Sequence, residues 1–398
     1  MKIGIVTYVR TATCNYGAEL QCFALQYILN KNGYDTEVLN LHRVLPSNSR
    51  FTQTVKKAIK TRLKHMNIFR ASISIAALVL SVCKDKYYNK KNHSIFLRKK
   101  EIFDDFFFNY IKHSEKEYYP NDLDTANLSY DTYIAGSDQI WNYNNSDRVD
   151  VFFLMFANRF KAKKISYAAS FSVSSIPEEY KKKYKQWINN IDFLSVRESE
   201  GISIIKEITG KQAKLVCDPT LLLDKEAWKN IFKDIQLPIK QEKYLLIYTM
   251  SRSNKVYQIA KEIAQRLGNI KIYSIKMNLH PNANKDINEL QFISPQQWVG
   301  LIMNAAYVVT DSFHGTAFSI NFNKPFTVVQ NPMSNLNSRV NTILSFLNLK
   351  DRIILNNTIK LPEFNLNIDY SKINQTVNAW REDSFIFLTN AINSKKIK

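Results

Sequence analysis

Short apolar runs alternate along the chain with segments whose apolar residues recur at helical spacing. The first run, residues 2–8, predicts a strand, and the segment 18–31, which follows a polar loop, predicts a helix. That helix is expected to end at Gly33, because glycine is common just past a helix C-terminus. A second strand over 36–41 would complete a β-α-β unit.

The same alternation continues to about residue 350. A first group of further strands is expected over 132–135, 164–168, 193–197 and 215–217. A second group is expected over 244–249, 271–275, 307–310 and 326–329, with helices over 256–267 and 295–304. Strands that alternate with helices predict parallel sheets covered by helices on both faces. The fold class is therefore expected to be α/β, with two Rossmann-like domains facing across a cleft.

The length of the chain also indicates more than one domain. Its 398 residues exceed the ~250–300 at which single hydrophobic cores stop growing. We expect an N-terminal Rossmann-like domain over 1–225, a charged linker, a C-terminal Rossmann-like domain over 240–350, and a tail with a helix over 351–398. Residues 50–119 interrupt the alternation, and we interpret them as a basic helical insertion in the first domain.

Positive charge is concentrated in this insertion. The formal net charge is +20, and the segment 50–100 contains 14 lysines and arginines against one acid, Asp85. Such a block is typical of a solvated helical face, but it can also attract an anionic membrane surface or nucleic acid. The sequence has no zinc-finger spacing, RNA-binding aromatic motif or helix-turn-helix pattern, so no specific nucleic-acid partner is expected.

The sequence predicts a cytoplasmic protein. Its first residues lack the features of a secretory signal, and its longest apolar run, 71–83, falls short of the ~20 residues of a membrane span. The cysteines lack metal-ligand spacing and are expected to be reduced thiols: Cys14, Cys22, Cys83 and Cys217. Neither a bound metal nor a cofactor is expected.

Ligands of open α/β sheets bind beyond the carboxyl ends of the strands, where two loops of the first domain carry unusual polar groups. In the first loop, Gly17 would let the backbone approach a ligand, although a simple turn and helix cap would have the same pattern. In the second loop, Ser137 or Asp138 could contact a ligand or only cap a helix. Trp141 could stack on a sugar ring or fill the core.

Two further strand ends carry groups suited to an anionic ligand. Arg197 has a planar fork that matches a carboxylate or phosphate, and its alternative is an internal ion pair with Glu198 or Asp192. His314, next to a glycine at a strand-to-helix turn, can donate a proton or bind an anion near neutral pH. Its alternative is a structural role in the core.

Several well-known motifs are absent from the sequence. It contains no GxxxxGK[ST] phosphate loop, GxGxxG dinucleotide turn, HExxH zinc helix or GxSxG nucleophile elbow. The residues by themselves therefore predict an α/β cleft protein that handles an anion, and no narrower activity.

Six stretches, in this order, resemble the polysaccharide pyruvyl transferase family: 15–21 (NYGAELQ), 134–142 (IAGSDQIWN), 164–171 (KISYAASF), 195–198 (SVRE), 218–222 (DPTLL) and 310–319 (TDSFHGTAFS). The resemblance implies a fold similar to GT-B glycosyltransferases, with the acceptor on the N-terminal domain and the donor on the C-terminal one. It implies a transferase that moves the enolpyruvyl group of phosphoenolpyruvate onto two sugar hydroxyls, giving a pyruvate ketal and phosphate.

The resemblance also implies roles for the residues singled out above. His314 would carry the proton or neutralise the departing phosphate, and Arg197 would clamp the donor carboxylate or phosphate. Ser312 and Arg339 would help to bind the donor. The residues expected to bind the acceptor are Asn15, Tyr16, Gly17, Ser137, Asp138, Gln139 and Trp141.

Acceptors of this family are often lipid-linked or polymeric glycans assembled at the inner membrane face. Contact of the basic segment 50–100 with anionic lipid is therefore a hypothesis that follows from the resemblance. Two other functions stay open on the sequence alone, a GT-B glycosyltransferase with a nucleotide-sugar donor and a non-catalytic glycan-binding or assembly protein.

Overall fold

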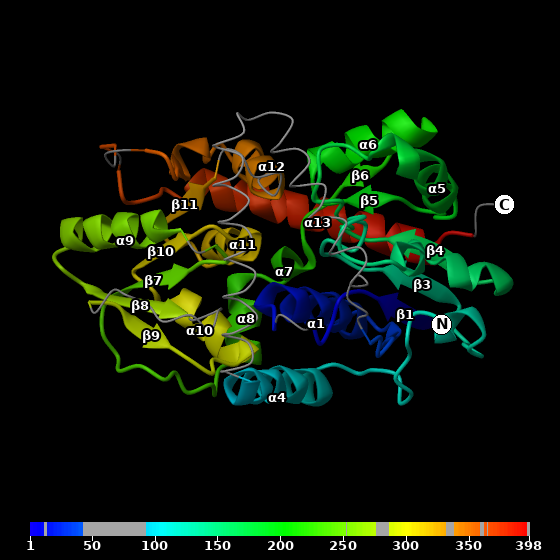
Figure 1. The fold of residues 1–398 in the computed structure, drawn as a ribbon, viewed down its shortest axis with the longest axis horizontal. Coiled ribbons are helices and arrows are strands. Elements are labelled where there is room, and N and C mark those ends of the chain that lie inside the picture. The colour runs from blue at the N-terminus through cyan, green and yellow to red at the C-terminus, as the bar shows by residue number, and fades with distance from the viewer. Residues whose placement is uncertain are drawn as a thin grey trace, which may run out of the picture.

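Two parallel β-sheets, each flanked by helices, make up the computed structural model of the chain (Figure 1). The predicted α/β fold with two Rossmann-like domains is confirmed. Part of the expected basic insertion, 50–92, lies outside the described residues. The structure describes residues 1–11, 14–42, 93–251, 253–275, 286–331, 338–358, 362–363 and 365–395.

The sheet of the first domain has the strand order β2-β1-β3-β4, and all of its strand pairs are parallel. Val6 at the end of β1 pairs with Ala135 at the end of β3, so the loops that follow both strands leave the same edge. A short parallel pair, β5-β6, lies beside it. The strands are β1 (Lys2–Val6), β2 (Asp35–Val38), β3 (Thr132–Ala135), β4 (Lys163–Ser166), β5 (Ser195–Val196) and β6 (Lys214–Leu215).

The sheet of the second domain has the strand order β12-β11-β10-β7-β8-β9 and is also parallel throughout. Thr310 at the end of β10 pairs with Tyr248 at the end of β7, so the loops after these two strands also leave one edge. The strands are β7 (Tyr244–Tyr248), β8 (Lys271–Ile275), β9 (Asn288–Leu290), β10 (Tyr307–Thr310), β11 (Phe326–Gln330) and β12 (Ile353–Leu355).

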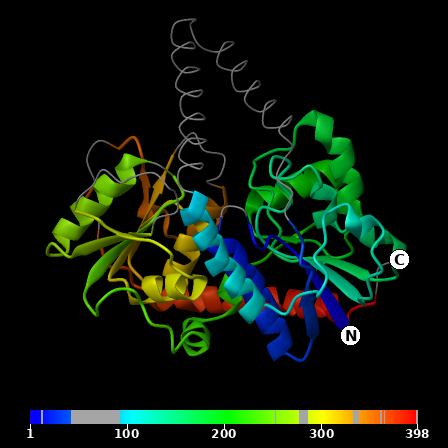
Figure 2. The same cartoon turned by 60° about the horizontal axis from the view of Figure 1, so that its bottom comes forward.

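The helices cover both sheets (Figures 1 and 2). Within the described residues, no helix is long and apolar enough to cross a membrane. The helices of the first part of the chain are α1 (Tyr16–Lys31), α4 (His93–Tyr110), α5 (Glu178–Asn189), α6 (Ser199–Thr209), α7 (Pro219–Leu222) and α8 (Lys225–Ile231). Those of the second part are α9 (Asn254–Arg266), α10 (Pro295–Asn304), α11 (Phe313–Asn321), α12 (Ser338–Phe346) and α13 (Ser371–Asn393).

The C-terminal end of the expected insertion belongs to the core of the first domain. Helix α4 buries Phe103, Phe106 and Phe107, and its axis lies along α1 in both views of the molecule (Figures 1 and 2). After α4, His113 pairs with Val38 at the outer edge of the sheet. These contacts hold α4 and the segment after it against the first domain.

The two domains share one continuous apolar core beneath their junction. Tyr16 of α1 stacks on Trp298 of α10 with a ring-centroid distance of 5.6 Å. The stretch expected to be a charged linker begins with helix α8, whose Trp228 is fully buried against Phe318 of α11. Helix α13 then runs back across both domains (Figure 2). Lys163 of β4 donates a hydrogen bond to the carbonyl oxygen of Ile392 in this helix.

Candidate functional site

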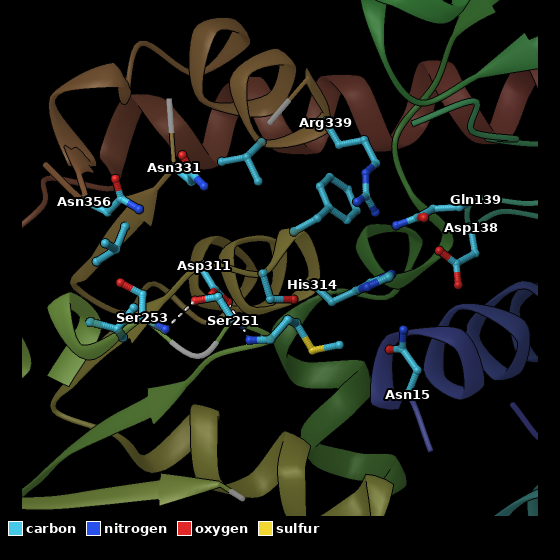
Figure 3. A pocket seen from close by; sticks show the side chains of 16 residues that line it. Asn15, Asp138, Gln139, Ser251, Ser253, Asp311, His314, Asn331, Arg339 and Asn356 are labelled. Atoms are coloured by element: carbon cyan, nitrogen blue, oxygen red, sulfur yellow. Dashed lines mark hydrogen bonds between the residues drawn. The ribbon is translucent and has the colours of Figure 1, made fainter. Parts of the chain in front are cut away.

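Loops from the carboxyl edges of both sheets converge on a cavity of about 660 Å³ (Figure 3). Its wall is made by both domains, so the cavity exists only when the two are joined. Among its lining residues are Asn15, Asp138 and Gln139 of the first domain and Ser312, His314 and Arg339 of the second.

Helix N-termini point at the cavity from both domains. Asn15 caps α1 by accepting a hydrogen bond from the backbone N–H of Gly17 at 3.0 Å. Ser312 caps α11 in the same way through the N–H of Gly315. Both residues therefore serve as helix caps, which for the loop of Asn15 was the alternative interpretation, and both also line the cavity. The unpaired N–H groups and dipoles of helix N-termini favour an anion.

His314, in the first turn of α11, lies between Arg339 and Gln139 on one side and Asn15 on the other (Figure 3). Its side chain is 5% exposed, and Nε2 lies 3.9 Å from Oδ2 of Asp218. Burial lowers the pKa of His314 to about 4, because the desolvation of the cation outweighs the attraction of Asp218. The imidazole is therefore neutral at pH 7.

The ring of His314 packs directly against the backbone of Gly17. A Cβ atom at position 17 would lie 1.9 Å from Nδ1 of His314, which no real contact allows. Glycine was expected here because it would let the backbone approach a ligand. In the structure the group that approaches the glycine is a side chain of the other domain, and contact of Gly17 with a ligand stays a prediction.

Arg197 forms the centre of a buried charge network next to the cavity. Its side chain is fully buried, and Nη1 donates to Oδ2 of Asp218 at 2.6 Å while Nη2 donates to Oδ1 of Asp138 at 3.2 Å. Glu198 lies 4.0 Å from Nε of Arg197, and the guanidinium stacks on the ring of Phe313. The expected direct clamp on the donor is thus corrected. Arg197 does not line the cavity, because its fork is occupied by carboxylates.

Among the lining residues that the structure describes, the cation is Arg339. With the amide of Gln139 oriented to present its oxygen, Nη2 and Nη1 of Arg339 donate to that oxygen at 2.7 and 3.1 Å. Among the residues that the structure describes, no carboxylate lies within ion-pair distance, and Nε has no hydrogen-bond partner. Burial, together with the charge of Arg197, lowers the pKa of Arg339 to about 10, so it is still a cation at pH 7.

The other end of the cavity lies in the second domain and is polar. Asp311, just after β10, accepts hydrogen bonds from the backbone N–H groups of Met250 and Ser251 and from the hydroxyl of Thr249 (Figure 3). This carboxylate holds the loop after β7 against the loop after β10. Around it the cavity is lined by Ser251, Ser253, Asn331 and Asn356.

A comparison with protein families decides the assignment. The family described as polysaccharide pyruvyl transferase matches residues 15–332, most of the chain. The chain belongs to this family. A comparison with curated protein sequences finds no match.

Solved structures were compared with this pyruvyl transferase family member, and one of them shows its fold. A structure from Listeria monocytogenes, assigned as a UDP-N-acetylglucosamine 2-epimerase, is similar with a TM-score of 0.52 and 10% identity, covering 100% of this chain and 98% of the other. The UDP-GlcNAc 2-epimerase of Methanocaldococcus jannaschii has a TM-score of 0.45 and 10% identity, covering 100% and 94%. At such identity, the first of these shows the fold alone.

Two aromatic residues of the pyruvyl transferase motifs are core residues and not part of the cavity wall. Trp141 is fully buried, stacks on Phe153 at 4.4 Å and donates its Nε1–H to the carbonyl of Phe152. Tyr16 is buried in the shared core, where its hydroxyl donates to the carbonyl of Ile293. The expectation that both contact the acceptor is corrected, because their rings and polar atoms are already occupied.

Asp218 is a residue of the buried charge network that sequence reasoning did not single out, although its motif was part of the resemblance. It caps α7 and accepts hydrogen bonds from Arg197 and from the hydroxyl of Ser137. Ser137 is therefore also buried in the network and does not line the cavity. The available signal was an aspartate before a proline at the end of an expected strand, the same position in which the other site residues lie.

Proposed function

We propose that this chain transfers the enolpyruvyl group of phosphoenolpyruvate onto two hydroxyls of a sugar, forming a pyruvate ketal and releasing phosphate. Family membership supports a transferase of polysaccharide synthesis. The observation that carries the donor assignment is a buried cation, Arg339, that faces the cavity beside the neutral His314 without a carboxylate partner among the described residues.

The donor brings a carboxylate and a phosphate, and the cavity offers groups for an anion of this kind. Arg339 can turn its fork from the oxygen of Gln139 to a carboxylate or phosphate, which is a stronger, charge-assisted contact. The N-terminus of α11, capped by Ser312, and that of α1, capped by Asn15, add positive potential from two sides. Arg197 contributes by keeping Asp138 and Asp218 in place.

In the proposed reaction, a proton adds to the methylene carbon of the donor and the adjacent carbon gains oxocarbenium character. One sugar hydroxyl attacks that carbon, phosphate leaves, and the second hydroxyl closes the ketal. Of the two hydroxyl protons, one ends on the new methyl group and the other on the phosphate. His314 lies in the cavity where it can pass a proton between these groups.

The sugar acceptor is proposed to occupy the polar end of the cavity. The volume of about 660 Å³ is larger than a molecule the size of phosphoenolpyruvate needs, so a sugar ring has room beside it. Ser251, Ser253 and Asn356 offer hydroxyl and amide groups that suit neutral sugar hydroxyls. We therefore propose that the acceptor contacts the second domain as well as Asn15 and Gln139.

A ligand panel followed by thermal unfolding tests the donor assignment. Phosphoenolpyruvate at ~100 times its dissociation constant should stabilise the protein by roughly 2.7 kcal/mol, whereas nucleotide sugars should not. Arg339→Gln should lose the effect, and the control Lys261→Gln, which removes an exposed cation outside the cavity, should keep it. Stabilisation by a nucleotide sugar alone would instead support a glycosyltransferase.

A further inference from the structure

The two ring nitrogens of His314 lie in different surroundings. Nε2 is sealed from solvent without a hydrogen-bond partner, and its neighbour is Oδ2 of Asp218 at 3.9 Å. Nδ1 is on the edge of the ring that meets Gly17, and it is not among the sealed, unpartnered atoms of the described residues. Among the described residues no hydrogen bond holds Nδ1 either, and since His314 lines the cavity, Nδ1 is the nitrogen left to meet a ligand there.

Asp218 is held in one orientation by contacts to both of its oxygens. Oδ1 accepts from the N–H of Thr220 at 3.1 Å and from its hydroxyl at 2.8 Å. Oδ2 accepts from Nη1 of Arg197 at 2.6 Å and from the hydroxyl of Ser137 at 2.8 Å. Although burial opposes its ionisation, Arg197 and these hydrogen bonds hold the pKa of Asp218 below its usual value. A fixed negative charge therefore faces Nε2.

We propose that Asp218 is a positioning residue that keeps the ring hydrogen of His314 on Nε2 and so makes Nδ1 the nitrogen that exchanges a proton with bound substrates. A neutral imidazole has one N–H and one lone pair, and a nearby group decides which nitrogen has which. A lone pair on Nε2 would face the carboxylate and be repelled, whereas an N–H there is attracted. The preferred tautomer is a property of the protein alone, and only the role given to Nδ1 rests on the proposed function.

The same arrangement predicts how His314 becomes charged. The carboxylates of Asp218 and Asp138 favour its cation, whereas the cations of Arg197 and Arg339 oppose it. An anion bound at Arg339 would offset the positive charge of that arginine. The attraction of the two carboxylates for the His314 cation would then outweigh the repulsion by the arginines. Donor binding is therefore expected to raise the pKa of His314 and to place the added proton on Nδ1.

The contact with Gly17 explains why Nδ1 is accessible at this point. A side chain at position 17 would overlap the Nδ1 edge of the ring, since its Cβ would lie 1.9 Å from Nδ1 and 2.3 Å from Cε1. Glycine at this position lets the ring lie with Nε2 toward Asp218 and with Nδ1 toward the N-terminus of α1. The backbone of one domain and the carboxylate of Asp218 thus orient the histidine of the other.

A nitrogen NMR experiment on the full chain tests this inference directly. The protein is labelled with ¹⁵N-histidine, and long-range ¹⁵N–¹H correlations are recorded at pH 7, with His314→Gln identifying its signals among the six histidines. The expected result is the Nε2–H tautomer for His314 in the wild type. The Nδ1–H tautomer in the wild type would overturn the inference without the need for any variant.

Variants and ligand then separate the inference from the proposed function. Asp218→Asn should lose the tautomer preference, and Ser137→Ala, which removes one hydrogen bond but leaves the charge, should keep it. Addition of phosphoenolpyruvate should shift the signal of Nδ1 to that of a protonated nitrogen. A correct tautomer without any response to phosphoenolpyruvate would contradict the proposed donor, whereas a response combined with the Nδ1–H tautomer would contradict the role of Asp218.

Discussion

The imidazole of His314 lies on the backbone of Gly17 so closely that a Cβ atom there would come within 1.9 Å of Nδ1. One residue is at the start of α1 in the first domain and the other at the start of α11 in the second. This contact joins the two domains at the cavity and restricts the position of the histidine ring there.

Gly17→Ala is expected to displace the ring of His314 and to destabilise the protein by about 1–3 kcal/mol, as overpacking of a filled site does. Chemical denaturation measures this loss. The matched control is the same substitution in a His314→Ala background, where the clashing ring is absent. There the added methyl group should cost clearly less, and an equal loss in both backgrounds would show that the contact does not matter.

Arg197→Gln is expected to reduce stability more than it reduces the intrinsic affinity for the donor. The substitution leaves the buried carboxylates of Asp138 and Asp218 without their cation, and breaking a buried pair in this way costs about 3–5 kcal/mol. Chemical denaturation of the ligand-free protein measures this loss of stability. A variant as stable as the wild type, with lost binding of phosphoenolpyruvate, would restore Arg197 as a direct clamp.

Arg339→Gln is expected to behave in the opposite way. The wild-type cation is buried and its pKa is lowered to about 10, so removal of the charge relieves an unfavourable burial. The melting temperature should stay the same or rise, while the stabilisation by phosphoenolpyruvate disappears. Retained stabilisation by the ligand would exclude Arg339 from the donor site.

His314 is expected to make the protein less stable in mild acid. Its pKa is about 4 in the folded state against 6.5 for the free side chain, so below pH 6.5 the unfolded chain binds a proton that the folded chain does not. Stability should therefore fall by up to roughly 3 kcal/mol between pH 6.5 and pH 4, relative to His314→Gln. Parallel pH profiles for the two proteins would show that the histidine is not buried as a neutral ring.

Trp141→Phe tests the assignment of this residue to the core. The carbonyl of Phe152 loses its hydrogen-bond donor, and a buried unsatisfied group costs about 1–3 kcal/mol. Denaturation should detect this loss, while the affinity for phosphoenolpyruvate and for sugars should not change. A specific loss of sugar binding in a stable variant would return Trp141 to the acceptor site.

The sequence predicts elements that local patterns determine. The strand Thr132–Ala135, the strand Tyr307–Thr310 and the helix Pro295–Asn304 were predicted with the bounds that the structure has. Each of these elements is a short apolar run or a capped amphipathic segment. The sequence pattern that predicts it is therefore contained in a few neighbouring residues. The predicted strand 193–197 was longer than the observed β5, Ser195–Val196, although Phe193 also forms an isolated bridge with Ile165 of β4. The place of the site, at the strand ends, follows from the alternation of strands and helices.

The partners within the site could not be predicted in the same way. The ion pair of Arg197 with Glu198, at 4.0 Å, was one of the expected alternatives, but its hydrogen bonds to Asp138 and Asp218, which are 59 and 21 residues away, were not expected. Such pairs depend on how β3, β5 and α7 are brought together. The cavity-facing role of Arg339 likewise depends on the packing of α12 against the first domain, which no local pattern contains.

Proton uptake on donor binding tests the central claim most directly, that an anionic donor binds beside Arg339 and converts a neutral His314 into its charged form. Phosphoenolpyruvate is titrated into the protein at pH 7 by calorimetry in two buffers with different ionisation enthalpies. The expected result is uptake of about one proton per ligand in the wild type, above the value for His314→Gln. Absence of binding, or binding with equal proton uptake in both proteins, would contradict the claim.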